Sequence, residues 1–129
     1  ARTTVGDLAE PRQVISAQEL VDYQQMLRRI PANPEVVKYA VKLSSATRPG
    51  SGAEATKWIR WGAGPRASQY LAIGARTWAA MHGHPVPTLE DVRSVALAVL
   101  RHRVVLNFEA EANGITVEQV VSQIVEEVS

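Results

Sequence analysis

The sequence lacks cysteine entirely, and only 5% of its 129 residues are aromatic. The absence of cysteine excludes disulfide bonds, thiolate zinc sites and cysteine nucleophiles, and it is typical of a reducing compartment. No apolar run approaches the ~20 residues that a membrane-spanning helix needs, and residues 1–10 are too polar for a signal peptide. We therefore expect a single soluble, cytoplasmic domain of ordinary size.

Acidic residues are missing from one long stretch of the chain. Residues 55–89 contain no Asp or Glu, whereas residues 104–129 contain five glutamates and no Lys or Arg. The net charge is only +1, which is not typical of a protein that binds nucleic acid. We call residues 55–89 the cationic middle, because their charged side chains are all basic. Either these side chains face a partner, or they pair with acidic side chains within the fold, or the charges are simply scattered.

Helix signals dominate the rest of the sequence. A capping box at 16–19 starts a helix that Pro31 ends, and Asn33 with Pro34 starts a second helix that ends near Thr47. The remaining signals predict a surface loop at 49–53, a long helix over about 65–81, a fourth helix after Thr88 and a fifth after Thr116. Apolar residues recur at helical spacing in the five segments: Leu20, Tyr23, Leu27 and Ile30; Val36, Val37, Ala40, Val41 and Leu43; Ala67, Tyr70, Leu71, Ala75, Trp78 and Ala79; Val92, Val95, Ala96 and Val99; Val117, Val120, Val121, Ile124 and Val128.

Strand signals are few and short. Residues 58–61 and 104–106 are β-prone and too short for helices, so we expect two short strands there. Gly74 in the long helix would let a neighbouring element approach closely. The predicted fold class is mainly α: one small bundle of about five helices with minor β strands.

The chemistry-bearing motifs of hydrolases are absent. A phosphate-binding P-loop needs Gly directly before Lys, but Lys38, Lys42 and Lys57 follow Val, Val and Thr. The Asp-Glu pair of nucleotide hydrolases is missing, since no Asp is followed directly by Glu, and no Gly-x-Ser-x-Gly motif is present. The chain alone should therefore not hydrolyse a nucleotide.

The three histidines do not form a recognisable metal or acid-base site. His82 and His84 lie close in sequence, but no carboxylate lies within the surrounding acid-free segment to orient a ring or supply a third ligand. We expect this pair to be solvated or to cap carbonyl groups, and His102 to be a hydrogen-bonded structural residue. No metal site is predicted.

The segment 62–68 is the best candidate for a binding site. A glycine cap at Gly64 would leave the first-turn amides, such as those of Ala67 and Ser68, without a side-chain acceptor. Arg66 would lie at the unfavourable end of the helix dipole. A phosphate would satisfy both features, so Gly64, Arg66 and Ala67 are the candidate ligand-binding residues. Alternatively, Arg66 pairs with a carboxylate of the domain and the glycines only form a turn.

Several motifs, in order, resemble the C-terminal lid of MoxR-family AAA+ ATPases. They include Tyr39 and the Thr47-Arg48 pair, and they extend over most of the chain from about Val14. The longer runs are Trp61-Gly62-Ala63-Gly64-Pro65-Arg66-Ala67, Thr88-Leu89-Glu90-Asp91-Val92, Val99-Leu100-Arg101-His102-Arg103-Val104-Val105-Leu106 and Glu109-Ala110-Glu111-Ala112-Asn113-Gly114-Ile115-Thr116. The family usually has Ser where Gly64 stands, and residues 49–57 and 1–12 match no pattern that we can name.

The resemblance implies a lid over 14–129 and a linker over 1–13 that leads from an ATPase core. It implies that Arg66 is the sensor-2 arginine, a catalytic residue that reaches the γ-phosphate of ATP, with ATP and Mg²⁺ held mainly by the core. The implied partners are that core, neighbouring subunits of a homo-oligomeric ring, and a client that is remodelled or matured by metal insertion. For Arg101-His102-Arg103 we expect packing against the core or a neighbour. A free-standing nucleic-acid-binding or protein-binding bundle is the alternative function.

Overall fold

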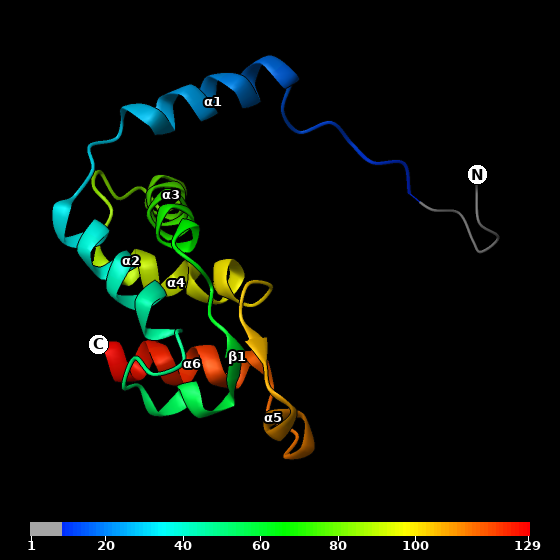
Figure 1. Ribbon diagram of the computed structural model, residues 1–129. Helices are drawn as coiled ribbons and strands as arrows, with labels where there is room; N and C mark the ends of the chain where they lie inside the picture. Colours follow the sequence, from blue (N-terminus) through cyan, green and yellow to red (C-terminus); the bar gives the residue numbers. More distant parts are fainter. Residues whose placement is uncertain (1–8) are drawn as a thin grey trace.

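The computed structural model describes residues 9–129 as a helical bundle with a small sheet at one edge (Figure 1). Residues 1–8 of the expected linker lie outside the described residues. In chain order the elements are α1 (Ala17–Arg29), α2 (Pro34–Ala46), the 3₁₀-helix η1 (Glu54–Trp58), β1 (Ile59–Trp61), α3 (Arg66–Met81), α4 (Leu89–Leu100), β2 (Val105–Leu106), α5 (Phe108–Ala112) and α6 (Val117–Val128).

The prediction of a mainly α fold with a minor β element is confirmed. The five predicted helices are α1, α2, α3, α4 and α6, and four of them begin at side-chain caps: Ser16, Asn33, Thr88 and Thr116. Helix α5 was not predicted, because five residues are too few to show helical periodicity. The first strand begins one residue later than predicted, since Trp58 ends η1.

The core lies between α2, α3, α4 and α6, whose apolar faces meet. Leu43, Leu71, Leu100 and Ile124 are fully buried there. Close packing of α3 on α4 depends on Gly74, as predicted, because a Cβ at that position would lie 3.1 Å from Cγ2 of Val95. Strands β1 and β2 pair antiparallel beside this core. Among residues 9–129, no helix is both long enough and apolar enough to cross a membrane.

Helix α1 departs from the core packing that its sequence predicted. It contains no buried residue, and its expected core positions Leu20 and Tyr23 are 48% and 51% exposed. Leu27 and Ile30, near its C-terminal end, are half-buried. Figure 1 shows that α1 lies apart from the bundle and joins it at the C-terminal end of the helix. We call this helix the arm. The expectation that Leu20 and Tyr23 lie in the core is therefore wrong, because helical periodicity marks an apolar face but does not show whether its own domain buries it.

The segment 49–57 lies against the end of α2 and the last turns of α6. The Ser51 hydroxyl donates to the Ala46 carbonyl oxygen, at 3.0 Å. The Glu127 carboxylate accepts the backbone N–H groups of Glu54 and Ala55, at 2.7 and 3.2 Å. A carboxylate at the start of η1 thus supplies the cap that Ala53 cannot provide. The acidic C-terminal segment thus meets this loop through backbone N–H groups, and among residues 9–129 no ion pair joins it to a basic side chain of residues 55–89.

Candidate functional site

The turn that leads into α3 is fastened to the C-terminal end of α2 by two buried hydroxyl groups. The Ser44 hydroxyl donates to the carbonyl oxygen of Gly64 at 2.9 Å. The Thr47 hydroxyl accepts the N–H of Ala63 at 2.9 Å and donates to the carbonyl oxygen of Ser44 at 2.6 Å. Ser44 is 3% exposed and Thr47 is fully buried. These hydrogen bonds therefore fix the position of the turn before α3 against the C-terminal end of α2.

Two glycines make this attachment possible. A Cβ at Gly62 would lie 2.8 Å from the carbonyl oxygen of Thr47, so only a residue without a side chain fits against α2. Gly64 has φ +78°, a left-handed conformation that glycine adopts without strain. The turn thus depends on glycine at Gly62 for close approach and at Gly64 for backbone conformation.

The first turn of α3 has no side-chain cap. Pro65 occupies the cap position, and the Ser68 hydroxyl donates to its carbonyl oxygen at 2.7 Å. The expectation of a free amide at Ala67 is wrong, because this N–H donates to the Gly64 carbonyl oxygen at 3.2 Å and the residue is fully buried. Among residues 9–129, no hydrogen bond from the backbone N–H groups of Arg66 and Ser68 is present. An anion at this helix end would satisfy them.

Arg66 is exposed at the start of α3. Within the described part of the chain no carboxylate forms an ion pair with it, and the ion pairs there belong to Lys38, His84 and Arg93. The alternative in which Arg66 pairs with a carboxylate of residues 9–129 is therefore wrong. Its guanidinium lies at the positive end of the helix dipole, an unfavourable position without an anionic ligand.

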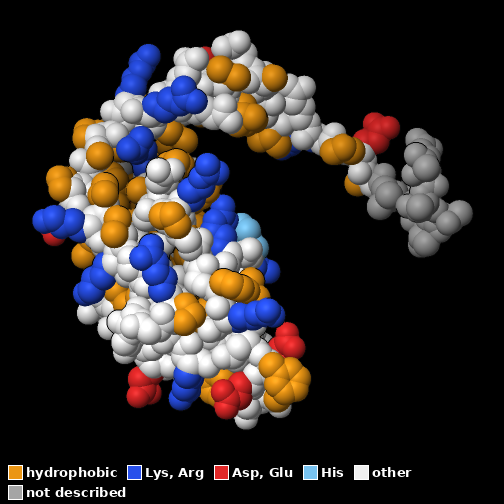
Figure 2. Space-filling model, in the orientation of Figure 1, with side chains coloured by type: hydrophobic (Ala, Val, Ile, Leu, Met, Phe, Trp, Pro, Cys, Tyr) orange, Lys and Arg blue, Asp and Glu red, His pale blue; other side chains and the backbone are white. Residues whose placement is uncertain are grey.

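Tyr70, one turn after Arg66 in α3, contacts a second arginine, Arg103, which follows α4. The Arg103 guanidinium lies 4.5 Å from the centre of the Tyr70 ring, and its Nη1 donates to the Val99 carbonyl oxygen at 3.1 Å. Tyr70 follows Arg66 by four residues, so the two side chains lie on the same face of α3. The structure thus places Arg103 against α3 of its own domain. Figure 2 shows basic side chains on the body beneath the arm and acidic ones mainly at the opposite end.

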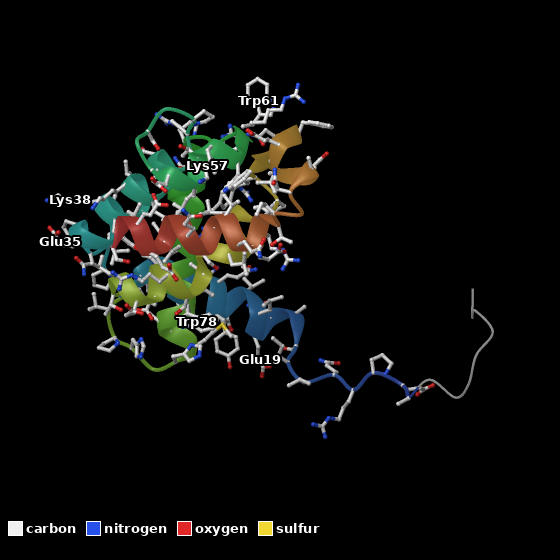
Figure 3. All side chains as sticks on the ribbon, turned by 90° about the horizontal axis from the view of Figure 1, so that it is seen from below. Glu19, Glu35, Lys38, Lys57, Trp61 and Trp78 are labelled. Carbon is white, nitrogen blue, oxygen red and sulfur yellow. The ribbon has the colours of Figure 1, made fainter. Side chains whose placement is uncertain are left out.

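The tryptophans do not form a stacking surface for bases. Trp78 in α3 is half-buried against the core, and Trp58 is likewise half-buried. Trp61 is 62% exposed. Figure 3 shows Trp61 projecting at the end of the molecule that carries Lys57, far from Trp78. Their separation gives no support to the alternative of a nucleic-acid-binding module.

The two histidines differ in their partners. His82 caps a carbonyl group as expected, because its Nδ1 lies 2.8 Å from the carbonyl oxygen of Trp78. His84 is oriented by a carboxylate, contrary to expectation. His84 Nδ1 lies 3.1 Å from Oδ1 of the buried Asp91, seven residues further along the chain. His82 stacks on Trp78 with ring centroids 4.3 Å apart. The acid-free segment ends at Leu89, and the fold of the 82–88 turn brings the first turn of α4 back to His84. Among the described residues, no group of three or more His, Asp or Glu side chains is placed to hold a metal ion.

Asp91 links the stability of the domain to pH. Burial, the largest influence, by itself raises the pKa of this carboxyl, but hydrogen bonds from Thr88 and His84 outweigh it and hold the pKa below 3.8. A lowered pKa stabilises the fold above the unfolded-state value, and the contribution is lost as pH falls through the folded-state value. We expect Asp91→Asn to reduce the free energy of unfolding at pH 7 by about 1–3 kcal/mol.

Denaturant unfolding at pH 7 and at pH 2.5 checks this expectation. The difference in unfolding free energy between wild type and Asp91→Asn should narrow at the lower pH, because the unfolded chain takes up the proton below the ordinary Asp pKa of 3.8 and the charged folded form loses its advantage. Glu126→Gln, which alters an exposed carboxyl of α6, should show little difference at either pH. An equal gap at both pH values would show that the charge of Asp91 is not what stabilises the fold.

Comparison with known proteins supplies the family context for this geometry. Residues 53–124 match the family model described as AAA lid domain. The chain is 30% identical over 123 residues to the chaperone MoxR1 of Mycobacterium tuberculosis, a match to 93% of this chain and 33% of that protein. It is 36% identical over 83 residues to the protein MoxR of Paracoccus denitrificans, covering 59% of this chain and 24% of the relative.

A solved structure agrees with the fold. A crystal structure of a candidate ATPase from Cytophaga hutchinsonii superposes with a TM-score of 0.80 at 30% identity, over 92% of this chain and 37% of that chain. The present chain therefore spans about a third or less of the length of the MoxR relatives. The matched family region includes the 62–65 turn, Arg66, Arg103 and the His84–Asp91 pair.

Proposed function

The chain belongs to the AAA lid domain family, as its resemblance to the MoxR lid predicted, and on that premise we propose that it couples ATP binding and hydrolysis in a separate AAA+ core to remodelling of a client protein. Arg66 is the residue that distinguishes ATP from ADP. In this proposal it acts as the sensor-2 arginine and contacts the terminal phosphate, together with the backbone of the Gly64 turn.

The observation that carries the proposal is the exposed Arg66 guanidinium at the uncapped start of α3. Both the guanidinium and the free first-turn N–H groups are donors that fit phosphate oxygens, whereas a cation or an apolar ligand would leave them unsatisfied. ATP would supply a negatively charged terminal phosphate. Mg²⁺ would be held by the core, since the described residues offer no cluster of metal ligands.

Coupling follows from the way the turn is fastened. Arg66 follows a turn whose carbonyl and N–H groups are bonded to Ser44 and Thr47 of α2. Donors that engage developing charge on the transferred phosphate stabilise the transition state, and the same contact ties the position of the lid to the state of the nucleotide.

The proposal extends to the client protein and to the assembly state. One relative is named as a chaperone, which supports chaperone-like remodelling of a protein client. Maturation of the client by metal insertion is the other form of the proposal, and it rests on the resemblance to the MoxR family alone. We also propose a homo-oligomeric ring in the cytoplasm, in which Arg66 meets the nucleotide of its own core or of the adjacent subunit. The isolated chain is not expected to hydrolyse ATP.

Hydrogen exchange in the complete ATPase tests the assignment. Amides of residues 66–69 should exchange more slowly with a non-hydrolysable ATP analogue than with ADP, because the terminal phosphate accepts hydrogen bonds from this helix end. The first turn of α6 is the internal control, because the Thr116 side chain already caps it. Equal exchange at 66–69 in both nucleotide states would reject the phosphate contact.

A further inference from the structure

The guanidinium of Arg103 is held on two sides by its own domain. It lies 4.5 Å from the centre of the Tyr70 ring, and its Nη1 donates to the carbonyl oxygen of Val99 at 3.1 Å. The same Nη1 contacts Nε2 of His102, which must be the acceptor because an arginine has only donors. These contacts orient the guanidinium before any ligand is present, so little ordering of this side chain is left for the binding step.

The contacts leave part of the Arg103 guanidinium unused. Among residues 9–129, no group accepts a hydrogen bond from its Nε or Nη2, and no carboxylate forms an ion pair with it. Tyr70 is 45% exposed and Arg103 is half-buried, so the remaining N–H groups are not enclosed in the core. The planar donors of a guanidinium match the oxygen atoms of a phosphate or carboxylate group two at a time. Arg103 therefore has donors available for an anionic ligand.

Arg66 lies on the same side of α3 as this stacked pair. Tyr70 follows Arg66 by four residues, which places their Cβ atoms about 5–6 Å apart on the helix surface. The segments that form this surface are free of acidic residues, since Asp and Glu are absent from 55–89 and from 92–108. Two cations that share a surface without a carboxylate repel each other. A ligand with more than one negative group removes that cost, whereas a single negative charge would suit one arginine alone.

We propose that Arg103 is a second nucleotide-contacting arginine, which binds a phosphoryl group that ATP and ADP both carry, and that Tyr70 is its positioning residue. This inference rests on the proposed function, because it takes the ligand of Arg66 to be the terminal phosphate of ATP. Arg66 is exposed and forms no ion pair within residues 9–129, so it can follow the phosphate that is present in ATP and absent from ADP. Arg103 is already oriented by protein contacts, which suits the part of the nucleotide that both states share.

Equilibrium titration of the complete ATPase with ADP and Mg²⁺ tests the contact. Arg103→Ala should weaken ADP binding roughly 10- to 100-fold, because it removes a charged hydrogen-bond donor from the bound phosphate. Arg101→Ala is the matched control, since it removes the same charge from an exposed side chain two residues away. The control should change the ADP dissociation constant by no more than about twofold, because solvent screens an exposed charge that makes no contact. An equal loss in both variants would overturn the proposal, because a general loss of positive charge would then explain it.

Substitutions of Tyr70 separate positioning from folding. Tyr70→Phe keeps an aromatic ring against the guanidinium and should keep the ADP affinity, whereas Tyr70→Leu removes the ring and should weaken ADP binding roughly 3- to 10-fold. Thermal unfolding of each complete ATPase checks that the variants are folded, and the Tyr70 pair decides the proposal if Arg103→Ala does not fold. Equal ADP affinity of Tyr70→Phe and Tyr70→Leu would overturn the positioning role. Wild-type ADP affinity in a folded Arg103→Ala enzyme would overturn the contact itself.

The use of ADP keeps this test apart from the test of the proposed function. ADP has no terminal phosphate, so Arg66→Ala should bind it as the wild type does while losing turnover. Normal ADP binding by Arg103→Ala, together with lost turnover in Arg66→Ala, would reject the second arginine and leave the proposed function standing. Normal turnover in Arg66→Ala would instead reject the proposed function, whatever the ADP affinity of the Arg103 variant.

Discussion

Replacing Arg66 by alanine in the complete ATPase is expected to lower ATP turnover by roughly 10- to 1,000-fold while much of the nucleotide affinity remains. The guanidinium is exposed and has no carboxylate partner among residues 9–129, so its replacement removes no ion pair from the described part of the fold. Charge develops on the phosphoryl oxygens during transfer, and a fixed cation stabilises that state more than the ground state. Steady-state hydrolysis and equilibrium nucleotide titration measure the two quantities separately.

The isolated chain supplies the matching stability measurement. Arg66→Ala should leave its free energy of unfolding unchanged or raise it by a few tenths of a kcal/mol, because a cation in the first turn opposes the helix dipole. Arg60→Ala, another exposed arginine of the cationic middle, is the control and should retain turnover. Normal turnover in the Arg66→Ala enzyme would remove the sensor role from this residue.

Gly62→Ala is expected to affect both stability and turnover. The new methyl group would lie 2.8 Å from the carbonyl oxygen of Thr47, 3.0 Å from its carbonyl carbon and 3.1 Å from the Cα of Arg48. All three are backbone atoms, so the turn must move away from α2 and strain its bonds to Ser44 and Thr47. Overpacking of this kind costs about 1–3 kcal/mol. A shift of about 1 Å at the start of α3 could lower turnover by up to ~100-fold, because Arg66 would no longer reach its ligand correctly.

Gly50→Ala provides a control of similar stability cost. Gly50 has φ +86°, and no other atom lies within 4 Å of the position that a methyl group would occupy. The substitution therefore brings backbone strain of about 1–2 kcal/mol without a clash. Denaturant unfolding of the isolated chains and hydrolysis by the complete enzymes give the comparison. If both variants lost turnover equally, general destabilisation and not displacement of Arg66 would explain the loss.

Local signals predicted most of the fold. The caps at Ser16, Asn33, Thr88 and Thr116 each act over three residues or fewer, and all four begin helices in the structure. Helix α5 escaped prediction because its five residues show no period. The exposure of α1 also escaped it, since an apolar face looks the same in sequence whether its own domain or another one covers it.

The candidate site was predictable only in part. Gly64 and Arg66 stood out because a glycine and a cation are unusual at a helix start. The anchoring role of Ser44 and Thr47 did not, because their partners lie 16 to 20 residues away. Asp91 was likewise missed as the partner of His84, since only the folded 82–88 turn brings the two together. Long-range contacts of this kind leave no local pattern.

Helix α2 connects α1 to the 62–65 turn, so the two ends of this path are joined by one helix. A short segment, residues 30–33, joins its first residue to α1, and its last turn is hydrogen-bonded to the segment before Arg66. With its inner face packed in the core, α2 cannot bend without opening the bundle. A displacement of α1 relative to the bundle would therefore be transmitted through one rigid helix to the 62–65 turn, and in the proposed function it would change how Arg66 meets the phosphate.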